Sequence, residues 1–110
     1  MKTCLKFAGM LGLAVAMGVP AVAQDDGAAI YKSKCQRCHR EDGMSHTFEG
    51  KMTSAAQFSN PEIVKMSDAD LTAVVKSGKK KMPAFGKKLS DDQIASVLAY
   101  VHTLQKQPSN

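Results

Sequence analysis

The pentapeptide CQRCH, residues 35–39, constrains this 110-residue chain more than any other feature. Two thiols separated by two residues can each add across a vinyl group of one porphyrin. The histidine that follows the second thiol can then bind the iron from the same side, and this spacing is typical of c-type haem attachment. The motif therefore predicts one covalent haem, attached through Cys35 and Cys38, with His39 as the proximal iron ligand.

Three other chemistries for these residues fit the sequence less well. A closed zinc site needs a fourth ligand and usually a second spaced pair; His46 is the nearby candidate, and a second CxxC is absent from the sequence. A thioredoxin-like pair would follow a strand in a βαβ pattern, which the sequence lacks. A disulfide between Cys35 and Cys38 would close a very short loop and constrain little.

The first residues have the layout of a secretory signal peptide. Two lysines precede the apolar run FAGMLGLAVAMGV, which is followed by a proline and the small residues AVA. The run is interrupted by glycines and is shorter than the roughly 20 apolar residues of a membrane-spanning helix. We therefore expect residues 1–23 to be cleaved, leaving residues 24–110 as one domain in the periplasm without a membrane anchor.

Helical patterns cover most of the remaining chain, and no segment has a convincing strand pattern. The expected helices span residues 25–39, 59–66, 67–78 and 90–105. Ser67 and Ser90 are expected caps, the latter with Gln93 in a capping box. Residues 40–58 are polar, with glycine turns and no clear period. The sequence predicts an all-α domain with three to four helices and substantial loops.

The iron needs a ligand on its second face, and Met82 is the leading candidate. It lies in the loop SGKKKMPAFGKKLS, far enough along the chain from His39 to reach the opposite side of a porphyrin. Pro83 fixes the backbone next to it without requiring a helix. A thioether opposite an imidazole gives the Met/His ligation that raises the reduction potential of electron-carrying cytochromes.

Other side chains could also bind the second face of the iron, so the identity of this ligand stays open. They are Met44, Met52, Met66, His46 and His102. Met44 is so close to His39 in the chain that its loop could not reach across comfortably. Met66 falls within an expected helix, and His102 lies beside the apolar stripe of the last helix, where a surface or boundary histidine is the more common interpretation.

Both ends of the domain resemble small soluble monohaem class I cytochromes c, and the resemblance covers nearly all of the mature sequence. GAAIYKSKCQRCH resembles the family's N-terminal helix, and KMPAFGKKLSDDQIASVLAYVHTL resembles its ligand loop and C-terminal helix. The match puts Met82 at the axial methionine. It also implies a contact where the two helices cross, formed by Gly27, Tyr31, Val97 and Tyr100.

The resemblance implies the class I cytochrome c fold, with helices wrapped around one covalent haem c. It further implies electron transfer between redox proteins and no enzymatic activity, with His39 and Met82 as the axial ligands. Two other roles stay open. One is a haem enzyme or gas-binding sensor with an open sixth position, and the other is a dedicated electron-donor subunit of a larger oxidoreductase.

Six lysines and no acidic residue occur in residues 71–90. They are Lys76, Lys79, Lys80, Lys81, Lys87 and Lys88. Around the ligand loop they would rim the haem edge and steer an acidic redox partner, whereas the simpler interpretation is a solvated loop. Nucleic acid is a poor alternative, because the chain is expected to be exported and lacks interleaved stacking aromatics. We expect a monomer.

Overall fold

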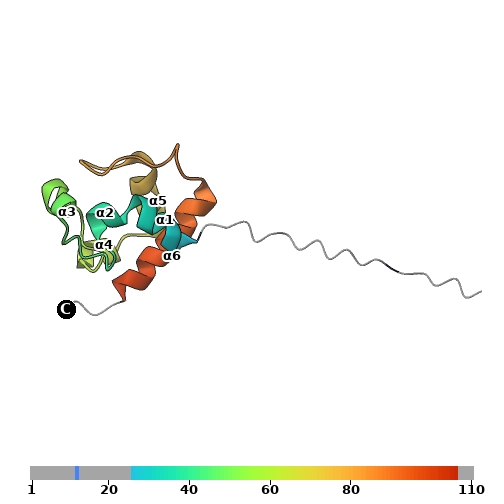
Figure 1. Ribbon diagram of the computed structural model, residues 1–110, viewed down its shortest axis with the longest axis horizontal. Helices are drawn as coiled ribbons and strands as arrows, with labels where there is room; N and C mark the ends of the chain where they lie inside the picture. The colour runs from blue at the N-terminus through green and yellow to red at the C-terminus, as the bar shows by residue number, and fades with distance from the viewer. Residues whose placement is uncertain (1–11, 13–25, 107–110) are drawn as a thin grey trace, which may run out of the picture.

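The domain is all-α in the computed structural model, which describes residue 12 and residues 26–106. Apart from Gly12, the predicted signal peptide lies outside the described residues. Within the described part there are six helices and no strand. They are α1 (Gly27–Lys34), α2 (Gln36–His39), α3 (Phe48–Thr53), α4 (Pro61–Val64), α5 (Asp68–Ser77) and α6 (Asp91–Gln105) (Figure 1).

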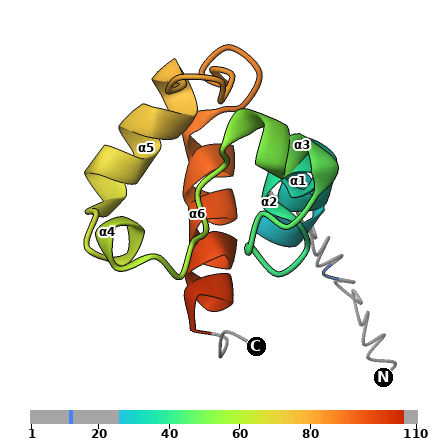
Figure 2. The ribbon, with the colours of Figure 1, turned by 90° about the vertical axis from the view of Figure 1, so that its left-hand side faces the viewer.

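The longest helix, α6, runs through the middle of the domain. Figure 2 shows α1, α2 and α3 on one side of it and α4 and α5 on the other, with the α5–α6 loop across one end. The predicted apolar stripe of α6 is buried along its whole length; it consists of Ile94, Val97, Leu98, Val101 and Leu104. Helix α6 therefore supplies the apolar surface against which both halves of the chain pack.

Helices α1 and α6 approach each other closely at Gly27. A Cβ added there would lie 2.1 Å from the backbone oxygen of Ser96 and 3.2 Å from the backbone nitrogen of Val97. One turn further along α1, the ring centroids of Tyr31 and Tyr100 are 5.2 Å apart. Tyr31 packs with Val97 in one buried cluster. The helix contact implied by the family resemblance is thus confirmed.

The predicted caps of α5 and α6, Ser67 and Ser90, are confirmed. The Ser90 hydroxyl accepts from the Gln93 backbone N–H, and the Gln93 side chain accepts from the Ser90 N–H, which completes the capping box. Ser67 caps α5 in the same way, through the Asp70 N–H. Asn60 caps α4 with Pro61 as its first residue. Each side chain satisfies a backbone donor that the first turn of a helix leaves free.

Two features of the helices differ from the prediction of three to four. The first helix is interrupted at Cys35, where φ is −116° rather than a helical value, so that α1 and α2 are separate elements. Helix α3 forms within residues 40–58, where no helix was expected. It has no apolar stripe to reveal it, because Phe48 and Met52 are exposed and its buried residue is Gly50.

The apolar core forms two clusters. One contains Leu71, Phe85, Leu89, Ile94 and Leu98. The other contains Tyr31, Val97, Val101 and Leu104. The first joins α5, the loop after it and α6, and the second joins α1 to α6. No helix within residues 26–106 is both long and apolar enough to cross a membrane.

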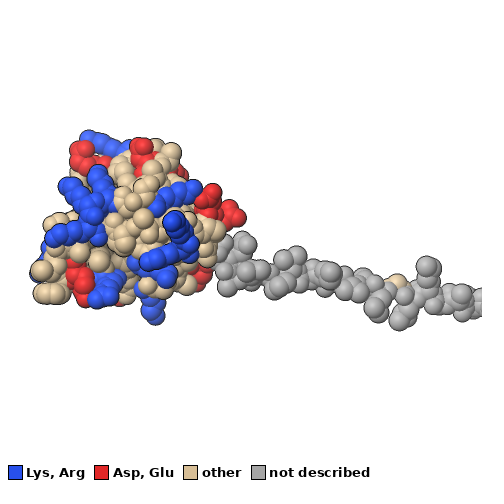
Figure 3. Space-filling model, turned by 90° about the horizontal axis from the view of Figure 1, so that it is seen from above, with Lys and Arg blue, Asp and Glu red and all other residues tan. Residues whose placement is uncertain are grey.

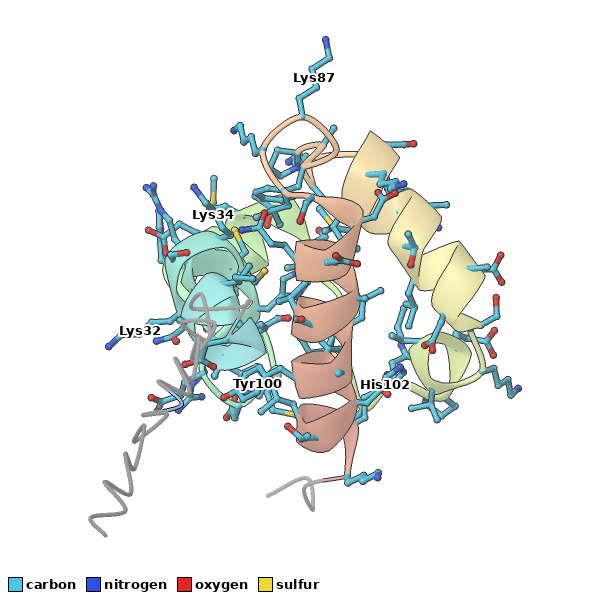
Figure 4. All side chains as sticks on the ribbon, turned by 90° about the vertical axis from the view of Figure 1, so that its right-hand side faces the viewer. Lys32, Lys34, Lys87, Tyr100 and His102 are labelled. Carbon is cyan, nitrogen blue, oxygen red and sulfur yellow. The ribbon has the colours of Figure 1, made fainter. Side chains whose placement is uncertain are left out.

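His102 links α6 to α5 at the edge of the first cluster. Its Nε2 lies 2.7 Å from an Asp68 carboxylate oxygen and its Nδ1 lies 2.8 Å from the Gln105 side-chain oxygen. These contacts, Gln105 first and then Asp68, raise the pKa of His102 above its ordinary value. Figure 4 shows His102 on the side of α6 opposite Tyr100. Both ring nitrogens are therefore engaged within the helix pair.

Gly27→Ala tests the close crossing of α1 and α6. We expect it to lower the free energy of unfolding by about 1–3 kcal/mol, because the new methyl group would meet backbone atoms of α6. Alanine on its own favours a helix over glycine by roughly 0.5–1 kcal/mol, so a net loss isolates the steric effect. Chemical denaturation of the haem-loaded protein measures it, with Ala29→Ser at an exposed position of α1 as the control. Unchanged stability of Gly27→Ala would contradict the crossing.

Candidate haem-binding site

One large cavity, of about 610 Å³, opens between the two halves of the domain. Its lining includes all four predicted site residues, which are Cys35, Cys38, His39 and Met82. Most of the remaining lining is apolar and comes from both core clusters, including Leu71, Phe85, Leu98 and Val101. Segments from both ends of the domain therefore face the same apolar space.

His39 is held in one orientation by a buried hydrogen bond. His39 is 9% exposed, and its Nδ1 lies 3.0 Å from the carbonyl oxygen of Ala56. Because a carbonyl can only accept, Nδ1 carries the proton and Nε2 keeps the lone pair that can bind a metal. Burial lowers the pKa of His39, against a smaller opposing effect of the Ala56 hydrogen bond. The ring is therefore neutral, which is the form that ligates iron.

The Ala56 carbonyl that orients His39 is itself fixed. It also accepts a hydrogen bond of 2.6 Å from the hydroxyl of Ser45, a buried residue. The backbone N–H of Ser45 in turn donates to the His39 carbonyl at 2.9 Å. This small network ties the residues after α2 to the segment after α3, and it gives His39 the backbone partner that the sequence alone could not identify.

Phe58 forms the second support of His39. The two rings are stacked, with centroids 4.5 Å apart and planes 24° apart. The same phenylalanine makes an edge contact with Tyr31, at a centroid distance of 6.1 Å. It comes from the unpatterned residues before α4, and sequence reasoning missed it. The stretch contains two aromatic residues, Phe48 and Phe58, and no local pattern shows which of them is packed inside.

The loop that carries Met82 is pinned by backbone hydrogen bonds. Lys79 and Met82 exchange two of them, of 3.1 and 2.9 Å, across a tight turn. Phe85 N–H then donates to the Val75 carbonyl at 2.8 Å, which anchors the loop to the end of α5. Gly78 has φ +74°, and a Cβ there would lie 2.6 Å from the Met82 oxygen, so the turn requires glycine.

Most of the alternative second ligands lie elsewhere. His46 contacts Gln57 in an exposed position, and His102 is bound to Asp68 and Gln105 as described above. Met44 and Met52 are not part of the cavity lining. Met66 does line the cavity, together with Met82. Two thioethers, those of Met66 and Met82, therefore line the same cavity as His39.

The donor set and the space fit a covalent haem. Both thiols are free of disulfide bonds, which argues against the disulfide interpretation of the CxxC. Burial, with a smaller contribution from Cys38, raises the pKa of Cys35 to about 11. The Cys35 thiol is therefore uncharged where it lines the apolar cavity. Within the described residues, no group of three or more His, Cys, Asp or Glu side chains could hold a metal ion, which leaves the zinc interpretation without a ligand set. An apolar cavity of this size is in the range of cofactor sites.

An all-α domain built around a CxxCH cavity has the architecture of a c-type cytochrome, and comparisons with known proteins agree. The family described as "Cytochrome C oxidase, cbb3-type, subunit III" matches residues 22–101. Cytochrome c6 from Synechococcus sp. (strain PCC 6312) is 35% identical over 108 residues, covering 92% of this chain and 91% of the relative.

Solved structures show the same relationship. The c-type cytochrome KustC0563 has a TM-score of 0.67 and 28% identity, covering 74% of this chain and 99% of its own. Cytochrome c6C from Synechococcus sp. PCC 7002 has a TM-score of 0.56 and 31% identity, covering 76% and 100%. The chain belongs to the class I cytochrome c family. It carries one covalently bound haem c and functions in electron transfer.

Phe58→Ala tests the aromatic support of His39. We expect the free energy of unfolding to fall by about 2–3 kcal/mol, below the full cost for a wholly buried phenylalanine, because Phe58 is partly exposed. Phe48→Ala is the matched control, since that ring is 76% exposed and should matter by less than about 0.5 kcal/mol. Denaturation of the haem-loaded variants measures both values. Similar losses for the two variants would show that the His39 stack contributes nothing specific.

Proposed function

We propose that this cytochrome carries single electrons between redox proteins, with its iron held by His39 on one face and Met82 on the other. The observation that carries the proposal is that both side chains line one cavity with Cys35 and Cys38. Bound haem would supply a one-electron couple between ferric and ferrous iron. The rest of the function depends on what the chain does around that group.

Met82 would complete the coordination and close the site to other ligands. A thioether is a soft ligand that favours the ferrous state and so raises the reduction potential. A filled sixth position leaves no place for peroxide or a diatomic gas, which argues against an enzyme or a sensor. The apolar lining, which includes Phe85 and Leu98, would keep water from the metal and support the same shift in potential.

The proposed place of action is the periplasm, after cleavage of residues 1–23. Support comes from the signal-peptide pattern of the N-terminal sequence. A free shuttle and a dedicated subunit of a larger oxidoreductase share this site, and they differ in whether the cytochrome copurifies with a larger complex. We favour the monomeric shuttle, because the lysines around the Met82 loop suit repeated, reversible docking.

The proposed docking face is basic and lies around the cavity mouth. Of the six predicted lysines, Lys79, Lys80 and Lys81 line the cavity, and Lys87 and Lys88 are exposed nearby in the chain. Lys76 contributes less free charge, because its Nζ lies 2.6 Å from an Asp91 carboxylate oxygen. Figure 3 shows basic side chains distributed around an uncharged area on this side of the molecule. An acidic redox partner would be attracted to such a face.

Met82→Leu and Met66→Leu together test the second ligand. We expect Met82→Leu to lose the weak near-infrared band of Met–iron ligation in the ferric protein and to bind carbon monoxide when reduced, because leucine has no donor atom. Met66→Leu removes the other thioether of the cavity without a large change in volume, so it should keep the band. Absorption spectra of the purified variants decide the matter. Loss of the band in Met66→Leu alone would transfer the assignment to Met66.

Charge reversal at the loop tests the docking face. We expect Lys87→Glu/Lys88→Glu to slow electron exchange with a carboxylate-terminated gold electrode severalfold at low ionic strength, with the difference disappearing in high salt. Lys32→Glu/Lys106→Glu makes the same change in net charge away from the loop, on α1 and at the end of α6. Figure 4 shows how far apart Lys87 and Lys32 lie. Equal slowing by both pairs would mean that only net charge matters.

A further inference from the structure

Helix α3 exposes two large apolar side chains on one side. Phe48 is 76% and Met52 is 61% exposed, and residues four apart lie next to each other on a helix. Glu49 and Thr53, the next residue after each of them, line the haem cavity. One side of this short helix therefore faces the cofactor site, while Phe48 and Met52 form an apolar ridge that faces outward.

The Phe48–Met52 ridge lies beside the basic loop. The Lys81 Nζ donates a 3.0 Å hydrogen bond to the Met52 carbonyl, so the residue before Met82 reaches from the loop to α3. Lys51 is also exposed on α3. The nearest acidic side chain of the helix, Glu49, is engaged by Arg37, with 3.4 Å between Nε and Oε1. Two lysines therefore lie near the ridge, and Glu49, the acidic residue of α3, is paired with Arg37.

Deepening the proposed function, on which this inference rests, we infer that the Phe48–Met52 ridge is the apolar contact at which an acidic redox protein docks. The charge of the neighbouring lysines selects the sign of the partner's surface. The ridge then adds a contact from which water is excluded, next to the cavity mouth, and charge attraction alone does not provide such a contact. Apolar residues at the centre of an interface with charges at its rim are the usual arrangement of a specific but reversible complex.

The size of the ridge favours a transient partner over a second copy of the chain. Two side chains on a six-residue helix cover far less than the roughly 1,000 Å² that a stable interface needs. The same small area disfavours a membrane surface, because the strength of interfacial binding scales with the apolar area that is buried. A small apolar contact with a basic rim fits a redox protein, because such a partner must dissociate after each electron transfer.

Val64 provides a matched control for the ridge. It is 53% exposed, so it is also a large apolar side chain in contact with solvent. It lies on α4, which Figure 2 places at the far end of α5 from the basic loop. Exchanging Val64 for serine removes exposed apolar surface elsewhere on the same protein, whereas Phe48→Ser/Met52→Ser removes it from the ridge.

The experiment uses gold electrodes as partners of defined chemistry, with the full haem-loaded protein. One electrode carries only carboxylate-terminated chains, and the other carries a mixture of carboxylate and methyl ends. Phe48→Ser/Met52→Ser should lower the electron-exchange rate severalfold on the mixed surface and little on the pure carboxylate surface. Val64→Ser should behave like the wild type on both. Equal rates for the wild type and the ridge variant on the mixed surface, or an equal loss in Val64→Ser, would overturn the inference.

Two further measurements cover the other occupants. A wild-type dimer in sedimentation that becomes monomeric in the ridge variant would assign the ridge to a second copy. If the wild type binds phosphatidylglycerol vesicles and the ridge variant does not, the ridge is a lipid contact. Either of these two results would overturn the inference. Reduction of the wild type by ascorbate in solution separates this inference from the proposed function. A protein that ascorbate reduces but that shows no ridge effect refutes docking alone, and one that is not reduced refutes both.

Discussion

The haem cavity is the constraint on which the rest of the structure depends, because it separates the apolar core into two parts. One cluster joins α5 to α6 and the other joins α1 to α6, and side chains of both line the same space of about 610 Å³. A domain of this size buries only a thin core from its own side chains. The covalently bound haem c therefore serves as the missing centre of the core as well as the redox group.

The crossing of α1 and α6 and the haem site are mechanically connected through Tyr31. The absent side chain at Gly27 lets α1 lie against α6, and this places Tyr31 between Tyr100 and Phe58. The Tyr31 hydroxyl donates to the carbonyl of Arg40, the residue after His39. Burial raises the pKa of Tyr31 well above its usual range, so the hydroxyl stays a donor. The packing of two helices is thereby transmitted to His39, the proposed iron ligand.

The sequence predicted those parts of the molecule in which local chemistry decides the structure. The capping box at Ser90 and the apolar stripe of α6 are short-range signals that the structure confirms. The CxxCH motif is also a short-range signal, and its two cysteines and its histidine line one cavity. Helix α3 was missed because its large apolar residues face solvent. The roles of Phe58 and the Ala56 carbonyl were also missed, since they depend on contacts between segments far apart in the chain. Such contacts have no period and no motif.

The two sides of the haem cavity are held by different means, and this matters for an electron carrier. His39 is supported by side-chain packing and by a carbonyl that a second hydrogen bond fixes. The proposed ligand Met82 is held by backbone bonds within its turn and from the loop to the end of α5. Neither support depends on the charge of the iron, because none of these partners is ionised. A site held by neutral contacts on both sides can keep its geometry when one electron arrives or leaves, so little reorganisation opposes the transfer.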